Sequence, residues 1–100
     1  MPIFVLMTRL APEALSDPRG RRTAGKEWLG KVSRLCPEVR WIAHYAILGA
    51  YDFMDIYEAP DMETAHRVSL LSRSEGASTA ESWQALPYDR YVKLLEETQA

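Results

Sequence analysis

Residues 48–61 read LGAYDFMDIYEAPD and decide the fold of this chain. The segment 49–52 is a turn signal, and runs rich in strand-forming residues flank it at 40–48 and 53–58. Because the connection between these runs is short, they are predicted to pair as an antiparallel hairpin. Asp52 is expected to hydrogen-bond the backbone of its own turn. Asp61, after Pro60, is predicted to cap a helix that follows.

The first part of the chain predicts one strand and one long helix. Residues 3–7 form a continuous apolar run, typical of a central strand covered on both faces. Residues 10–20 are predicted to be a loop with one helical turn near 13–16. A helix then begins at Pro18 with Asp17 as its cap, or nearer Thr23 because Gly20 weakens the first turn. Its predicted packing stripe is Trp28, Leu29, Val32, Leu35 and Cys36.

The last part of the chain predicts a second helix, an edge strand and a short terminal helix. The helix capped by Asp61 is expected to end at Gly76, a residue common at helix C-termini. Its predicted packing stripe is Met62, Ala65, Val68 and Ser69. Residues 78–86 alternate loosely, as in an edge strand. After Pro87, an amphipathic helix is indicated by Tyr88, Tyr91, Val92 and Leu95.

This order of elements predicts an α+β, ferredoxin-like βαββαβ fold with a four-stranded antiparallel sheet and a C-terminal helix. Right-handed crossovers would place both main helices on one face, with the first and third strands central. The pattern Gly49-x-Tyr51-Asp52, then a short strand and Glu58-Ala59-Pro60-Asp61, resembles the GYD-domain family, and the likeness runs from the first strand to about Leu86. The resemblance implies one domain over residues 1–100, pairing into a dimeric α+β barrel, and no agreed activity.

A homodimer is also predicted from the strands themselves. Two helices can cover one face of the sheet, yet the first three strands carry large apolar side chains on both faces. One unprotected face would hold Ile42, Ala46, Phe53 and Tyr57, or the opposite set. Such a patch exceeds what soluble monomers usually expose. A second sheet packed against the open face would cover it.

Composition excludes several classes of function. The chain has 100 residues and a formal net charge of −2. Arg19, Arg21 and Arg22 flank Gly20 without interleaved aromatics, which favours a solvated loop over phosphate or nucleic-acid binding. The single cysteine, Cys36, is expected to be a small buried hydrophobe. With no leader pattern and no long apolar segment, the chain is expected to be soluble and cytoplasmic.

No cofactor or metal is expected. The sequence contains neither a glycine-rich phosphate loop nor a nucleophile elbow, and its two histidines, His44 and His66, fall on different elements. His44 lies on a strand where a buried polar group needs a partner. An even-length hairpin loop, such as one that pairs Leu48 with Phe53, places Asp55 on the same face as His44. An odd-length loop places them on opposite faces.

The candidate site therefore consists of His44 and Asp55, predicted to share a polar pocket inside the dimer. Aromatic side chains that could line a ligand pocket are Trp41, Tyr45, Phe53 and Tyr57. A structural role for His44 is favoured over a catalytic one. The preferred function is a dimeric module that binds a small apolar or aromatic molecule, or that serves as a non-catalytic interaction protein.

The alternative, implied by the resemblance to dimeric α+β barrels, is a cofactor-free monooxygenase or isomerase-like enzyme. His44 would then act as acid and base, and Asp55 would orient it. An enclosed pocket that contains both residues would favour the enzyme, and a solidly packed interface would favour the module. Whether the chain is an enzyme stays open at this stage. Nucleic-acid binding by the sheet fits poorly, because the paired aromatic signature is absent.

Overall fold

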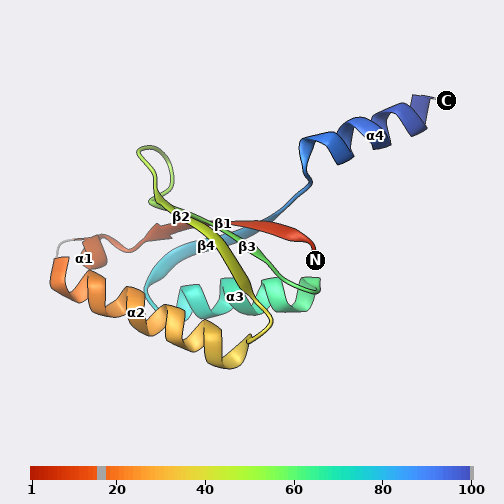
Figure 1. The fold of residues 1–100 in the computed structure, drawn as a ribbon. Coiled ribbons are helices and arrows are strands. Elements are labelled where there is room, and N and C mark those ends of the chain that lie inside the picture. Colours follow the sequence, from red (N-terminus) through yellow and green to blue (C-terminus); the bar gives the residue numbers. More distant parts are fainter. Residues whose placement is uncertain (16–17, 100) are drawn as a thin grey trace.

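The computed structural model describes residues 1–15 and 18–99. The elements run β1 (Ile3–Leu10), α1 (Pro12–Leu15), α2 (Pro18–Leu35), β2 (Arg40–Ala46), β3 (Phe53–Glu58), α3 (Met62–Ser74), β4 (Ala77–Ala85) and α4 (Tyr88–Gln99). The four strands form one antiparallel sheet in the order β2-β3-β1-β4, so the first and third strands are central. Helices α2 and α3 lie together under one face (Figure 1). The predicted βαββαβ arrangement is confirmed.

Helix α2 begins at Pro18, earlier than the alternative start near Thr23. Proline is well suited to a first helical turn, since its fixed φ matches the helix and its missing N–H has no partner there. One interior glycine costs only about 1 kcal/mol, which a helix of 18 residues with a packed stripe can offset. The predicted cap Asp17 lies outside the described residues. Only part of the predicted stripe is covered: Trp28, Val32 and Cys36 pack inward, while Leu29 and Leu35 are exposed.

Both ends of helix α3 are defined by the residues that flank it. Asp61 has an extended backbone, and its Oδ1 accepts hydrogen bonds from the Thr64 backbone N–H at 2.8 Å and from the Thr64 hydroxyl at 2.7 Å. Gly76 follows the last turn with φ of 109°, a conformation that residues with a Cβ rarely adopt. Both predicted boundaries are confirmed. The predicted stripe is partly wrong, because Met62 is exposed and Ser69 half-buried, and the buried residues are Thr64, Ala65, Val68 and Ser72.

The β2–β3 hairpin differs in register from the predicted pairing. Ala46, not Leu48, lies opposite Phe53, so the connection spans 47–52. This loop is two residues longer than expected and still even in length, so the strand faces are those the even-loop prediction required. A second irregularity lies between Trp41 and Ala43, where Ile42 is the extra residue of a β-bulge. The bulge places Trp41 on the same face as His44.

The 47–52 loop is anchored to β1. The Asp52 carboxylate accepts a hydrogen bond from the Leu10 backbone N–H at 2.7 Å, and the Asp52 N–H donates to the Thr8 carbonyl at 2.8 Å. The expectation that Asp52 bonds its own turn is therefore wrong for the side chain. Tyr51 packs edge-to-face against Trp83, with ring centroids 5.7 Å apart. The Tyr-Asp half of the GYD pattern thus holds the hairpin tip against β1 and β4.

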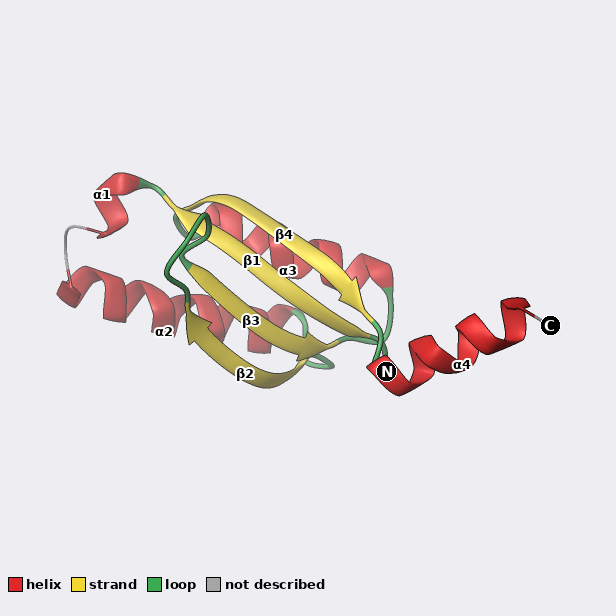
Figure 2. Cartoon of the chain, turned by 90° about the horizontal axis from the view of Figure 1, so that it is seen from above, coloured by secondary structure: helices red, strands yellow, loops and turns green. Residues whose placement is uncertain are grey.

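The core lies between the sheet and the helices α2 and α3. It is formed by Phe4, Leu6, Val32, Cys36, Tyr57, Ala59, Ala65 and Val68. Cys36 is buried as predicted, and burial raises the pKa of its thiol. The opposite face of the sheet carries no helix in the described part of the chain, as Figure 2 shows with the strands in front of α2 and α3.

Helix α4 stands apart from this body. It follows β4 after a two-residue link, and along its described length, Tyr88–Gln99, it buries no residue. Figure 1 shows it beyond the end of the sheet and on the side away from α2 and α3. Its apolar side chains remain open to solvent, with Tyr88 78% exposed.

Candidate functional site

His44 and Asp55 meet directly across the β2–β3 hairpin. They are register partners, and Nδ1 of His44 lies 2.7 Å from Oδ1 of Asp55. When Asp55 is ionised its carboxylate can only accept, so the imidazole donates from Nδ1 and leaves Nε2 as its second functional atom. The pairing of Leu48 with Phe53, one even-length case, would set His44 opposite Tyr57 and diagonal to Asp55. The observed loop is two residues longer, which makes Asp55 the direct partner.

The two members of this pair differ in their exposure to solvent. The side chain of Asp55 is 8% exposed, whereas that of His44 is 43% exposed. Desolvation raises the pKa of the Asp55 carboxyl, and the hydrogen bond and charge of His44 act in the opposite direction without cancelling it. A carboxylate of this kind holds an imidazole in a fixed tautomer and orientation, which suits either a structural pair or an acid–base pair.

Aromatic rings surround the imidazole. The ring of Trp41 lies 5.0 Å from that of His44, and Trp28 from α2 lies 6.4 Å away in an edge-to-face arrangement. Trp28 is itself held by a 2.9 Å hydrogen bond from Nε1 to the Ser72 hydroxyl of α3. The histidine is therefore packed on its core side by two indoles and remains open on the other side.

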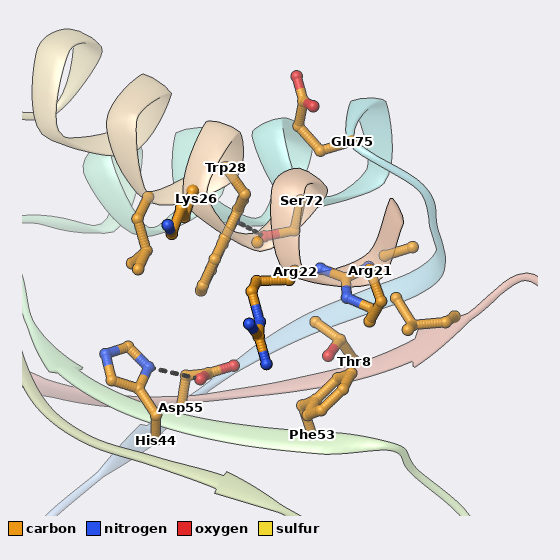
Figure 3. A pocket seen from close by; sticks show the side chains of 14 residues that line it. Thr8, Arg21, Arg22, Lys26, Trp28, His44, Phe53, Asp55, Ser72 and Glu75 are labelled. Carbon is orange, nitrogen blue, oxygen red and sulfur yellow. Dashed lines mark hydrogen bonds and ion pairs between the residues drawn. The ribbon is translucent and has the colours of Figure 1, made fainter. Parts of the chain in front are cut away.

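A pocket of about 390 Å³ adjoins the pair, between α2 and the sheet. Figure 3 shows Arg21, Arg22, Lys26 and Trp28 reaching into it from α2, above Thr8, His44, Phe53 and Asp55 on the strands. Its volume falls in the range of small-molecule sites. It is open to solvent on one side, so it is a cleft and not a sealed cavity.

Not every predicted pocket residue lines this cleft. Phe53 does, whereas Tyr45 points to the opposite face of the sheet and is 54% exposed. Tyr57 is fully buried in the core, its hydroxyl 2.6 Å from that of Ser82. Trp41 packs between Trp28 and Tyr57 and is not among the lining residues. The expected location is also wrong: the cleft lies on the helix-covered face, not on the face predicted to pair in the dimer.

The α2 side of the cleft was missed at the sequence level. Arg21 and Arg22 were read as part of a solvated loop, and Trp28 as core alone. Once α2 is known to start at Pro18, the spacing reveals them: Arg21 and Arg22 precede Gly25 and Lys26 by one turn. Residues three or four apart share a helix face, so these side chains line one surface. Ser72 and Glu75, from the end of α3, complete the cleft and carried no sequence signal.

Metal ligands, membrane spans and the second histidine also bear on function. No group of three or more His, Cys, Asp or Glu side chains is placed to hold a metal ion among them. None of the described helices is both long enough and apolar enough to cross a membrane. His66, the second histidine, lies exposed on α3 and lines no part of the cleft beside His44.

Comparisons with known proteins agree with this fold. A curated relative is 41% identical over 96 residues, covering 96% of this chain and all of that protein; it is named glutamine synthetase and cystathionine beta-lyase binding protein, from Thermus thermophilus. Two solved structures resemble the fold at 15% identity. The crystal structure of FFRP-DM1 has a TM-score of 0.57 and covers 86% of this chain and 100% of its own. Hypothetical protein PHS023 from Pyrococcus horikoshii has a TM-score of 0.53, with 87% and 92% covered.

The family model that matches is the GYD domain, over residues 4–95. The match includes every strand but for the first residue of β1, together with α2, α3 and most of α4. The loop anchored by Tyr51 and Asp52 thus belongs to the matched region, and the resemblance seen in the sequence is confirmed. This chain belongs to the GYD domain family.

Proposed function

We propose that this protein is a homodimeric interaction module that binds metabolic enzymes, with glutamine synthetase and cystathionine beta-lyase as its first candidate partners. The observation that carries the proposal is the full-length, 41% identical relative whose name states that it binds these two enzymes. A match over nearly the whole of both chains leaves no separate domain of the relative to account for that binding.

The open face of the sheet supports the dimer. The strand register lines up Ala43, Ile56, Val5 and Trp83 directly across all four strands. Beside them lie Tyr45 and Met54, whereas Met7 on the same face is already buried within the chain. A contiguous apolar surface of this kind is characteristic of an interface, since burying it against a second sheet removes its side chains from water.

Helix α4 supports the same arrangement. It projects on the side of the sheet that would face a second copy (Figure 1). Its apolar stripe, formed by Tyr88, Tyr91, Val92 and Leu95, follows the helical repeat, and all but the half-buried Val92 are exposed. We expect each α4 to lie along the partner subunit, so that both uncovered surfaces of the chain are buried by one assembly.

The test is direct binding between purified proteins. The chain is immobilised, and glutamine synthetase and cystathionine beta-lyase from the same organism are passed over it separately. Saturable binding of at least one enzyme at micromolar concentration or below is expected, and an unrelated enzyme of similar size and charge is the control. No binding of either enzyme, with the chain folded, contradicts the proposed partners.

A second candidate function is a cofactor-free enzyme. The observation that favours it is the 2.7 Å contact between His44 and Asp55 at the edge of an accessible cleft. In that role His44 would move a proton and Asp55 would orient it. His44→Ala should then abolish turnover while the dimer stays folded. Loss of folding in that variant would instead assign the pair a structural role.

A further inference from the structure

The cleft beside His44 carries more positive than negative charge on its walls. Its cations all come from α2 and are Arg21, Arg22 and Lys26. Its carboxylates are Asp55 and Glu75, and both are engaged: Glu75 forms an ion pair with Lys31, and Asp55 bonds His44. Within residues 1–15 and 18–99, no carboxylate forms an ion pair with any of the three α2 cations. Their charge is therefore available to a ligand.

The two guanidinium groups are directed into the cleft. Figure 3 shows Arg22 extending from α2 toward Asp55, and Arg21 above Thr8 and Phe53. The guanidinium carbon of Arg21 lies 5.8 Å from the centroid of the Phe53 ring. A planar guanidinium can hold a carboxylate through two parallel N–H donors, which makes arginine a selective anion ligand.

The remaining walls are apolar and partly rigid. Trp28 projects from α2, and its indole is held by the hydrogen bond to the Ser72 hydroxyl. Phe53 lies on the strand below it. Leu10, Leu29 and Ala77 extend this apolar lining. An aromatic or aliphatic ligand body is stabilised by such walls, while their low polarity strengthens the attraction between the arginines and a charge brought beside them.

We propose that this cleft binds a small organic anion with an aromatic or apolar body, whose carboxylate is held by Arg21 and Arg22 and whose body packs against Trp28 and Phe53. The sequence-based expectation of a small apolar or aromatic ligand assigns no role to the α2 cations. The inference goes beyond the proposed function and does not depend on the dimer, because the cleft lies on the sheet face opposite the one assigned to the dimer.

The first experiment compares matched charged and neutral probes. Phenylacetate and indole-3-acetate are titrated into the full chain, each beside its neutral amide, and the backbone and indole N–H resonances are followed by NMR. At least one carboxylate is expected to shift the signals of Thr8, Gly25 and the Trp28 indole. It should bind about tenfold more tightly than its amide, the gain typical of a charge-assisted hydrogen bond. The proposal would be overturned if each acid bound with the same affinity as its own amide, or if the chemical-shift changes were confined to the open sheet face.

The second experiment removes single charges from α2. Arg22→Gln and Arg21→Gln should each weaken carboxylate binding by about tenfold and leave the weak binding of the amide unchanged. Arg34→Gln is the matched control, because Arg34 is an exposed cation of the same helix that lines no part of the cleft. If Arg34→Gln weakens binding as much as the other two, the attraction is a general charge effect and the assigned site is wrong.

The third experiment blocks the cleft without changing its charge. Gly25→Leu places a side chain into the lining, and Gly30→Leu adds the same side chain to α2 where nothing lies within 4 Å. Both changes remove a helical glycine, so the two variants gain similarly in helix propensity. Gly25→Leu should abolish carboxylate binding while Gly30→Leu retains it. Equal binding by both folded variants would place the ligand elsewhere and contradict the proposal.

Discussion

Two neighbouring rows of side chains cross the same four strands and point in opposite directions. His44, Asp55, Leu6 and Ser82 face the helices, and Ala43, Ile56, Val5 and Trp83 face away from them. On the first face α2 and α3 cover the core, and the cleft beside His44 lies at its edge. On the second face no described helix lies over the strands, and Tyr51 of the 47–52 loop packs against Trp83 there. Alternation along a strand thus gives one sheet two separate surfaces, one for a site and one for assembly.

Tyr57 tests the closed face, and its removal should have the largest effect. It is fully buried, and its ring stacks on that of Phe4 with the centroids 5.5 Å apart. Its hydroxyl forms a hydrogen bond with that of Ser82. Tyr57→Ala should lower the free energy of unfolding by about 3–5 kcal/mol, as is usual for deleting a buried aromatic ring. Urea unfolding followed by circular dichroism measures the loss. A change below about 1 kcal/mol would mean that this face is loosely packed.

Ile56, which directly precedes Tyr57 on β3, tests the open face. Ile56→Glu places a charge in the centre of the proposed interface, where a desolvated carboxylate without a partner is costly. We expect a loss of roughly 2–4 kcal/mol of dimerisation free energy, the range of interface hot spots. Sedimentation velocity should show a folded monomer. Leu70→Glu on the exposed side of α3 is the control and should remain dimeric; a dimer in both variants contradicts the assignment of the open face.

Removal of α4 should act on assembly and not on folding of the subunit. Since no residue of α4 is buried, a chain ending at Pro87 should retain its secondary structure in the remaining elements. Loss of contacts with the partner subunit should weaken the dimer by about tenfold, or about 1.4 kcal/mol. Concentration-dependent sedimentation provides the measurement. An unchanged dissociation constant would show that α4 has another role.

The smallest expected effect is a pH dependence that comes from Asp55. Burial raises the pKa of its carboxyl above the ordinary value of 3.8, so the folded state holds its proton more tightly than the unfolded state does. Its contribution to stability is therefore fully present below that ordinary value and is lost as pH rises through the raised pKa. The stability of the unmodified chain relative to Asp55→Asn should fall across this window and then level off. A relative stability that rises with pH would mean that the charge of His44 outweighs burial.

The fold could be predicted from the sequence because each boundary has its own local signal. Asp61 and Gly76 have the cap chemistry that starts and ends α3, and the short hairpin connection forces β2 and β3 to be neighbours. Whether His44 and Asp55 share a face depended on the parity of the hairpin loop, which the sequence left open: any even loop places them on one face, and an odd loop does not. The true loop is longer by two residues, which moved the direct partner from Tyr57 to Asp55 without changing the face.

The lining of the cleft could not be predicted in the same way, for two physical reasons. The bulge at Ile42 shifts Trp41 to the helix side, and a bulge leaves no reliable trace in an alternating pattern. The positions of Arg21 and Arg22 in the cleft depend on where α2 begins. Gly20 disfavours a helix there locally, but the packing of the whole helix outweighs this cost. Ser72 and Glu75 arrive from a second helix, and their place beside α2 is set by tertiary packing.

The proposed assembly pairs the open face of the sheet with the same face of a second copy of the chain. The decisive measurement is the mass of the unmodified chain in solution, by sedimentation equilibrium from low- to high-micromolar concentration. A dimer predicts twice the chain mass of 11.4 kDa at every concentration in that range. A mass equal to one chain throughout would contradict the claim, and the row of Ala43, Ile56, Val5 and Trp83 would then need a different partner.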